Sequence, residues 1–244
     1  MKNRFLLFSI LGLLFMFSCR PESFDIDMSI IKDSYEIQIE EPSGLAYSKD
    51  KLSLYTVSDQ GKIYQISLTG DVLRELPFKG DDFEGITVDS ETSEICICEE
   101  REGNLIKLDS IGVFQSTYDI LQTPGNSGLE GLTYNHSDEV YYMLKEKMQG
   151  TLIKYDVKSN SVTQLVLGFA HDYSGLFYHH ISNTIWIVSD ESRTLTQCTT
   201  EGIALKIYDL PISGVEGIVV NDDETEAYVV SDPNNKLYKI DLTM

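Results

Sequence analysis

Short segments in which apolar and polar residues alternate recur along the chain beyond residue 34. This alternation is the pattern of β-strands, because successive side chains of a strand point to opposite faces of the sheet. Clear examples are 35–39 and 62–68. The segment 52–57 is rich in Leu, Tyr and Val, and Thr69-Gly70-Asp71 supplies a tight turn before a further strand at 72–78. Beyond Ser18, no segment has a sustained helical period. The pattern therefore predicts an all-β protein.

A short signature divides these strands into repeats. Its five copies are Ser43-Gly44-Leu45, Glu84-Gly85-Ile86, Glu130-Gly131-Leu132, Ser174-Gly175-Leu176 and Glu216-Gly217-Ile218, and their glycines recur with a period in the low forties. Such a period with about four short strands per repeat is typical of a β-propeller, in which each repeat is one blade. We expect the glycine to allow a bend or a close approach where the innermost strands converge.

The strands after each signature complete the blades. Second strands are expected at 52–57, 94–98, 140–144, 184–188 and 226–230, and third strands at 62–68, 105–108, 152–155, 195–198 and 237–240. The last repeat has only three strands before the chain ends. We expect residues 35–39 to supply the fourth, which closes the ring and removes an exposed sheet edge. The predicted fold is a five-bladed β-propeller with four antiparallel strands per blade.

The N-terminus has the pattern of a targeting segment. Lys2 and Arg4 precede an apolar run over residues 5–17, which is too short to cross a bilayer as a helix but suits a signal peptide. Ser18-Cys19 follows and resembles a bacterial lipobox, so we expect lipid on Cys19. The predicted division is a lipoprotein signal at 1–18, a tether at 19–34 and the propeller at 35–244. We expect an extracytoplasmic protein of the bacterial cell envelope, held in the outer membrane. The alternative is an ordinary secretory signal.

The charge narrows the range of partners. The chain has 39 acidic and 19 basic residues, a net charge of -20. Nucleic-acid binding is not expected, because it depends on Lys and Arg side chains that neutralise phosphates. Divalent cations and cationic ligands suit the charge better. The alternative is that the excess of acid serves solubility alone.

The repeat also places acids at equivalent positions. Antiparallel pairing brings the start of each first strand and the end of each second strand to the same face of the propeller. The signature supplies Glu84, Glu130 and Glu216, with Ser43 and Ser174 in the other two blades, and we expect these five residues to circle the mouth of the central channel, with a second circle of acids just outside. The second strands are followed by Asp59, Glu99, Glu146, Asp190 and Asp232. Four of these acids lie at one constant offset from the signature glycine, and Glu99 comes one position earlier.

Such a concentration of carboxylates needs protons, bases or a bridging cation. Hard oxygen ligands without a supporting set of Cys or His favour calcium, with magnesium second. Lys145 and Arg101 lie in the same loops and could neutralise part of the cluster. The alternative is that the acids cap backbone amides and form salt bridges between blades without an ion. His179-His180 adjoins a hairpin, and we expect both histidines in a solvated turn.

The ordered motifs resemble the SdiA-regulated family of bacterial cell-envelope proteins. The likeness covers residues 35–244 and includes Pro42-Ser43-Gly44-Leu45, Asp82-Phe83-Glu84-Gly85-Ile86, Leu129-Glu130-Gly131-Leu132, Asp172-Tyr173-Ser174-Gly175-Leu176, Val188-Ser189-Asp190-Glu191-Ser192 and Val230-Ser231-Asp232-Pro233-Asn234, with Lys145-Glu146 at a further family position. The resemblance implies a five-bladed propeller and, for some members, a link to calcium homeostasis. It brings no established catalytic activity. Many members have a membrane anchor helix, so the lipobox is a variation of this chain.

Three functions fit these patterns. The first is a non-catalytic, calcium-binding propeller in envelope or calcium homeostasis. The second is a metal-dependent hydrolase, a lactonase or phosphoesterase, because the Glu-Gly motifs also look like those of gluconolactonase-type enzymes, in which such a Glu holds the metal. The third is a protein-interaction platform with purely structural acids. No serine elbow, phosphate-cradling glycine loop or Cys/His nucleophile pair is visible, which favours a non-enzymatic role.

Overall fold

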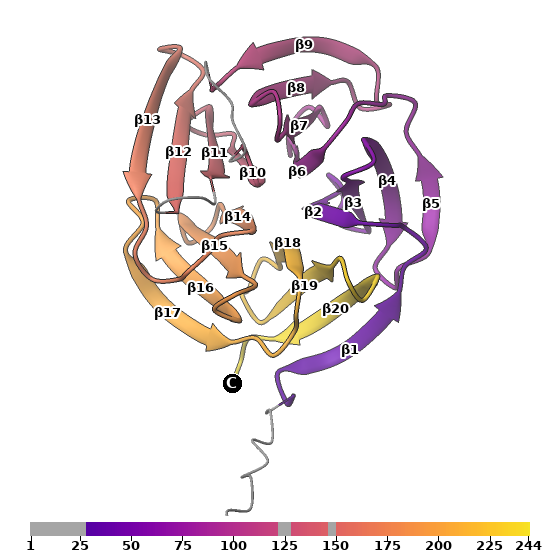
Figure 1. Ribbon diagram of the computed structural model, residues 1–244, viewed down its shortest axis with the longest axis vertical. Coiled ribbons are helices and arrows are strands. Elements are labelled where there is room, and N and C mark those ends of the chain that lie inside the picture. Colours follow the sequence, from indigo (N-terminus) through magenta and orange to yellow (C-terminus); the bar gives the residue numbers. More distant parts are fainter. Residues whose placement is uncertain (1–27, 122–127, 146–149) are drawn as a thin grey trace, which may run out of the picture.

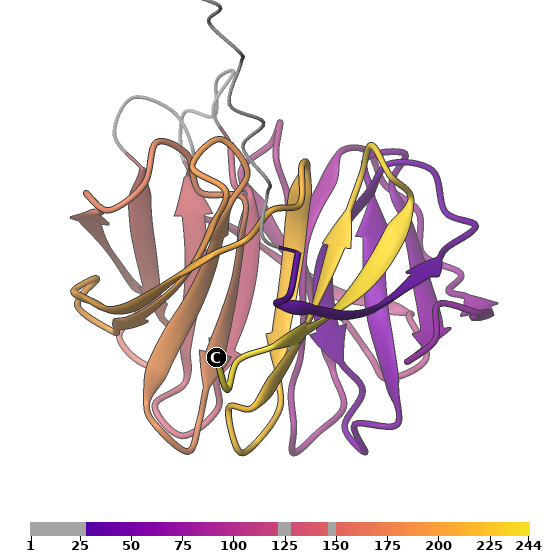
Figure 2. The same cartoon turned by 90° about the horizontal axis from the view of Figure 1, so that it is seen from below.

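Five four-stranded sheets surround a central axis in the computed structural model, which describes residues 28–121, 128–145 and 150–244 (Figure 1). Every neighbouring pair of strands within a sheet is antiparallel. The side view in Figure 2 shows strands running between two faces of the ring, with the hairpin loops at those faces. The predicted five-bladed β-propeller is confirmed. Among the described residues there is no helix with the length and apolarity needed to cross a membrane.

Each blade runs from an innermost strand outward. Blade 1 has β2 (Pro42–Tyr47), β3 (Ser53–Ser58), β4 (Lys62–Ser67) and β5 (Val72–Glu75). Blade 2 has β6 (Phe83–Val88), β7 (Ile95–Glu99), β8 (Asn104–Leu108) and β9 (Phe114–Asp119). Blade 3 has β10 (Gly131–Asn135), β11 (Val140–Lys145), β12 (Thr151–Asp156) and β13 (Ser161–Val166). Blade 4 has β14 (Gly175–His179), β15 (Thr184–Ser189), β16 (Thr194–Thr199) and β17 (Ala204–Asp209). Blade 5 has β18 (Val215–Val220), β19 (Glu226–Ser231), β20 (Lys236–Asp241) and β1 (Ile31–Glu36).

An N-terminal strand closes the ring, as predicted, but it begins earlier in the chain than expected. The strand β1 covers Ile31–Glu36 instead of 35–39 and pairs with β20. Beyond it, Ile37 and Ile39 are buried in the cluster between blades 5 and 1. Their burial explains the alternation that drew the prediction toward 35–39. The true strand is mostly exposed, so its sequence has no apolar face to mark it.

The five signature glycines mark the closest approach of neighbouring blades. A Cβ on Gly85 would lie 2.6 Å from the backbone nitrogen of Leu132, and a Cβ on Gly217 would lie 2.6 Å from the carbonyl carbon of Gly44. Gly175 similarly leaves 2.4 Å to the Glu216 carbonyl oxygen. A side chain at these positions would collide with backbone that cannot move aside. The repeated glycine therefore allows the innermost strands to converge around the axis.

The hydrophobic core lies between blades. Five clusters of buried residues fill the five spaces between neighbouring sheets. The three cysteines of the described residues, Cys96, Cys98 and Cys198, are free and buried in two of these clusters. Burying apolar area in this way stabilises the ring at about 25 cal/mol per Å². Because apolar side chains fill the spaces between the blades, we look for candidate sites at the two ends of the axis.

We name the two ends by their residues. The acidic face is where the innermost strands begin, at Ser43, Glu84, Glu130, Ser174 and Glu216. The pocket face is where the innermost strands end, at Tyr47, Val88, Asn135, His179 and Val220. The register confirms that the first-strand starts and second-strand ends share the acidic face, since Phe83 is opposite Glu99 and Val215 is opposite Ser231.

Candidate metal centre at the acidic face

A β-bulge directs the side chain of Glu84. In blade 2, Phe83 is opposite Glu99 and Gly85 is opposite Cys98, so Glu84 has no partner in the ladder. Glu216 is the equivalent extra residue in blade 5. A bulge turns a side chain away from the regular alternation, and bulges often lie beside functional sites. On Glu84, Oε2 accepts a 2.7 Å hydrogen bond from Ser43 Oγ of blade 1. The bulge and this contact hold one carboxylate at the junction of two blades.

Three carboxylates meet at this junction. Asp82, Glu84 and Glu100 each offer a carboxylate oxygen, and these oxygens all lie within 4.8 Å of one another. Asp82 adopts a positive φ of 60° immediately before β6, and its carbonyl oxygen accepts a 3.0 Å hydrogen bond from the Glu100 backbone nitrogen. That bond draws the turn after β7 toward the start of β6. The two turns therefore bring Glu100 next to Asp82 and Glu84, although most of β6 and all of β7 lie between them in the sequence.

Asp82 is less well satisfied than its counterpart in blade 4. The equivalent Asp172, which has the same place relative to its signature glycine, accepts hydrogen bonds from the backbone nitrogens of Asp190 and Glu191 at 2.9 and 3.0 Å. Asp82 is 8% exposed, and its Oδ2 has no hydrogen bond within the described residues. Arg101 Nε lies 3.0 Å away from Oδ2 but without the alignment of a hydrogen bond. A buried carboxylate oxygen without a hydrogen-bond donor is costly, and the largely exposed Arg101 guanidinium offsets only part of that cost.

Burial and mutual repulsion shift the acidity of this cluster. Burial, reinforced by the charge of Asp59, raises the pKa of Glu84 to about 8, against the lowering effect of the Ser43 hydrogen bond. Burial and Glu100 raise the pKa of Asp82, which Arg101 partly offsets. Burial, followed by Glu41 and Asp232, raises the pKa of Asp59 to about 6. The folded protein therefore concentrates carboxyl groups that a proton or a metal ion must neutralise.

Arg101 supplies part of the compensation. Its Nη1 donates a 2.7 Å hydrogen bond to Asp81, and its Nε contacts Asp82. The Arg101 side chain is 65% exposed, so these contacts are screened by solvent. The expectation that Arg101 neutralises part of the cluster is confirmed. The Arg101 guanidinium lies beside Asp82. Among the described residues, no ion pair joins Arg101 to Glu84.

The structure brings together several of the acids named from the sequence. Electrostatic effects on Glu84 come from Asp59 and Glu216, and those on Asp59 come from Asp232. These four residues therefore share the acidic face. Glu130 directly precedes β10, and its backbone nitrogen donates to the Leu144 carbonyl.

The remaining predicted acids lie elsewhere or outside the described residues. Glu99 ends β7, and burial raises its pKa; the polar groups that act on it are Asn104, Glu102 and Asp81 instead of the members of the triad. Asp190 accepts a hydrogen bond from the Gly214 backbone nitrogen, which is the capping role of the structural alternative. Glu146 and the lipobox Cys19 fall outside the described residues.

Sequence reasoning missed two members of the triad, although a signal for one was present. In the other four blades, the second-strand acid lies at one constant offset from the signature glycine. The same offset in blade 2 selects Glu100, the first residue after β7, instead of Glu99. Asp82 lies within the signature segment, but only the bulge and the positive φ show that its carboxylate reaches Glu84.

Comparison with known proteins identifies a family for the sequence and similar structures for the fold. Residues 22–241 match the family described as SdiA-regulated. A streptogramin B lyase structure has a TM-score of 0.54 at 16% identity, covering 87% of this chain and 73% of that chain. Virginiamycin B lyase from Staphylococcus aureus has a TM-score of 0.52 at 17% identity, covering 82% and 66%. The β-propeller domain of Myceliophteria thermophila Cps50 (Swd1) has a TM-score of 0.51 at 12% identity, covering 82% and 65%. At these identities the structures share the fold alone.

Proposed function

The chain belongs to the SdiA-regulated family, and we propose that it is a non-catalytic propeller that binds a divalent cation, calcium, at its acidic face. The ligands would be Asp82, Glu84 and Glu100, with Asp59, Glu216 and Asp232 as surrounding negative charge. The observation that carries this proposal is the convergence of three carboxylate oxygens within 4.8 Å of one another.

The spacing of the triad suits one ion. Calcium binds oxygen at about 2.3–2.6 Å, so two of its ligands lie no more than about 5 Å apart. All three carboxylates can therefore reach the same ion without a change of backbone. Three carboxylates offer up to six oxygens, and water completes the shell of six to eight that calcium takes. Magnesium demands a more regular octahedron and is the weaker candidate.

Binding would resolve the two costs that the cluster carries. The cation coordinates the buried Asp82 Oδ2, which has an ion pair with Arg101 but no hydrogen bond. It also replaces the proton of Glu84, whose pKa burial raises to about 8. Since most Glu84 side chains are protonated at pH 7, binding at this site should release about one proton per ion. Weak association with exposed carboxylates elsewhere on the protein would release none.

Isothermal titration calorimetry tests the proposal directly. Calcium is titrated into the purified protein at pH 7 in two buffers with different heats of ionisation, which together give the number of protons released. We expect one site, a release of about one proton, and a higher melting temperature with calcium. Glu84→Gln should abolish both the proton release and the rise in melting temperature. Glu201→Gln, which removes an exposed acid from an outer loop, is the matched control for net charge.

The interaction-platform and hydrolase alternatives give different results. A melting temperature that does not move at millimolar calcium would leave the acids as structural groups. The hydrolase has one specific observation in its favour, because a carboxyl group with a pKa of about 8 is within the range of general acid–base catalysis. A panel of lactones and phosphoesters with added calcium or manganese separates the two. We expect no turnover above that of Glu84→Gln.

The membrane anchor is a separate part of the proposal and rests on the sequence pattern at Cys19. We propose that lipid on Cys19 holds the propeller to the bacterial outer membrane, outside the cytoplasm. Several acyl chains on one cysteine give stable anchoring. Metabolic labelling with a fatty acid should mark the native chain in the membrane fraction. Cys19→Ser should lose the label and appear in the soluble fraction. A label that survives this substitution would refute the anchor.

A further inference from the structure

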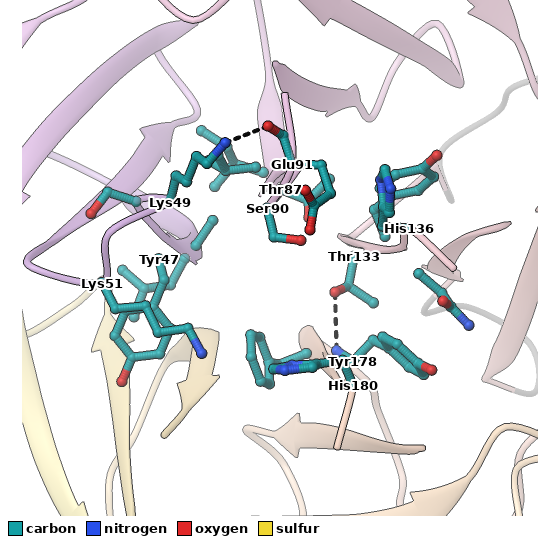
Figure 3. A pocket seen from close by; sticks show the side chains of 18 of the residues that line it. Tyr47, Lys49, Lys51, Thr87, Ser90, Glu91, Thr133, His136, Tyr178 and His180 are labelled. Carbon is teal, nitrogen blue, oxygen red and sulfur yellow. Dashed lines mark hydrogen bonds between the residues drawn. The ribbon is translucent and has the colours of Figure 1, made fainter. Parts of the chain in front are cut away.

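A cavity of about 330 Å³ opens at the pocket face, at the other end of the axis from the acidic cluster (Figure 3). Its origin is a difference in size between blades. At the second position after each signature glycine, blades 1 to 3 have the smaller residues Ala46, Thr87 and Thr133, whereas blade 4 has Phe177. These four residues line the cavity. Small side chains in three consecutive blades leave space that one aromatic ring bounds on the opposite side.

The walls of the cavity are apolar and aromatic. Leu45 and Ile86 are almost fully buried beneath it. Tyr47 and Phe177 meet edge to face, with ring centroids 6.3 Å apart and planes at 78°. Tyr134 contributes a further ring to the lining. Aromatic faces of this kind pack against the flat side of a ring-shaped ligand.

Hydroxyl groups are available inside. Thr87 is 8% exposed and lines the cavity, and its hydroxyl makes no hydrogen bond with any described residue. Ser90 and Ser137 add hydroxyls at the rim that are likewise without a partner in the described part of the chain. By contrast, the Thr133 hydroxyl already accepts a 3.0 Å hydrogen bond from the Tyr178 backbone nitrogen. The buried hydroxyl of Thr87 therefore offers a hydrogen bond to a polar group on a bound ring.

One positive charge at the rim is left without a carboxylate. Lys51 pairs with Asp222, and His136 Nδ1 lies 3.1 Å from Asp89. The ammonium of Lys49 donates instead to the backbone carbonyl of Glu91, and no ion pair joins it to a carboxylate of the described residues (Figure 3). The ammonium can neutralise one negative charge on a ligand.

We propose that this pocket binds a small hydroxylated ring that carries one carboxylate. The aromatic walls contact the ring, Thr87 hydrogen-bonds a hydroxyl, and the Lys49 ammonium pairs with the carboxylate. Two sources share this chemistry, a uronic acid and a hydroxybenzoate. The Glu91 carboxylate also lines the rim and weakens the binding of an anion. This site is separate from the proposed cation site and does not depend on it.

Calorimetric titration with four probes distinguishes the sources. Glucuronate and 4-hydroxybenzoate are the acids, and glucose and benzyl alcohol are their neutral counterparts. EDTA is present throughout, so the acidic face makes no contribution. We expect one of the acids to bind with a Kd at or below the low millimolar range and its neutral counterpart to bind at least about tenfold more weakly. The acid that binds identifies the source.

Two substitutions of opposite effect test the assigned contacts. Lys49→Met keeps the apolar stem and removes the charge, so it should weaken the acid about tenfold without affecting the neutral probe. Glu91→Gln should strengthen the acid by a few-fold because it removes a repulsion. Lys158→Met, on the outer side of blade 3, is the control and should change neither. The proposal is overturned if neither acid binds at about 10 mM, if the neutral probes bind equally well, or if Lys49→Met binds the acid unchanged.

Discussion

The acidity of Glu84 gives a prediction with a definite sign. Burial raises its pKa from 4.5 to about 8 in the folded protein, so the folded state binds the proton more tightly than the unfolded state. In the absence of a cation, the contribution of Glu84 to the free energy of unfolding is therefore most favourable below pH 4.5 and falls as the pH rises toward 8. The loss amounts to about 1.4 kcal/mol per pH unit, or about 3 kcal/mol at pH 7.

Glu84→Gln removes this penalty while keeping the shape of the side chain. The amide oxygen can still accept the hydrogen bond from Ser43 Oγ. In EDTA we expect the variant and the native protein to be equally stable near pH 4.5 and the variant to be more stable by up to about 3 kcal/mol at pH 7. With calcium present the order should reverse, because the variant loses a ligand.

Urea denaturation followed by tryptophan fluorescence measures the effect. Trp186 is the single tryptophan of the chain and is buried between blades 4 and 5, so its emission reports global unfolding. Curves in EDTA are recorded from pH 4.5 to pH 8 for both proteins. Asp59, with a pKa raised to about 6, titrates in both, and the difference between them isolates Glu84. A stability difference that does not grow with pH would refute the reasoning.

Three further predictions test other parts of the structure. Gly85→Ala should lower the free energy of unfolding, measured in urea, by about 3 kcal/mol or more, because its Cβ would lie 2.6 Å from the backbone of the next innermost strand. Gly168→Ala is the control and should be near neutral, since its Cβ would have nothing within 4 Å. An equal effect of both substitutions would contradict the close approach of the innermost strands. Glu224→Ala should lower the free energy of unfolding by about 1–3 kcal/mol and shift the fluorescence of Trp186, because Trp186 Nε1 donates a 3.2 Å hydrogen bond to Glu224. Unchanged fluorescence would count against this bridge between blades 4 and 5. Arg101→Gln should raise calcium affinity a few-fold by calorimetry, since it removes a competing cation, whereas a fall in affinity would mean that Arg101 helps to hold the site.

The propeller was predictable because its signature is dictated by backbone contact. The glycine of every blade must allow the next strand to approach, so all five copies persist in the sequence. The second and third strands were also visible, because the second strands are buried on both faces and the third strands contain buried apolar residues among half-buried ones. Outer strands are exposed, as Val72–Glu75 shows, and have no such pattern. The closing strand was therefore assigned to the buried residues Ile37 and Ile39 that follow it.

The candidate site was only partly visible from the sequence. Periodicity led to Glu84 and to the acids around it, since these positions repeat from blade to blade. The backbone geometry of the triad also repeats, since the positive φ and the bond to the residue after the second strand recur at Glu41–Asp59 and at Gly214–Asp232. What does not repeat is an acid at both of these positions together with a signature glutamate, which blade 2 alone combines. Constant spacing could have found Glu100, whereas nothing in the sequence distinguishes Asp82 from the capping Asp172.

The pocket face was not foreseen, because it depends on the sizes of side chains from four blades. His179 illustrates the same limit. The prediction of a solvated turn was wrong for this residue, which is 1% exposed and has its Nδ1 2.8 Å from Ser182 Oγ and its Nε2 3.2 Å from the Asn221 carbonyl. The neighbouring His180 is exposed, as expected. The packing of blade 5 against blade 4 decides between the two, and local sequence does not encode it.

A crystal structure determined with calcium would show directly whether an ion binds at the acidic face. We expect one ion there, with carboxylate oxygens of Asp82, Glu84 and Glu100 at about 2.3–2.6 Å from it and Arg101 turned away from Asp82. Crystals of Glu84→Gln grown in the same way should lack it. A calcium site is ruled out if, at saturating calcium, no ion lies between the three carboxylates and Arg101 remains beside Asp82.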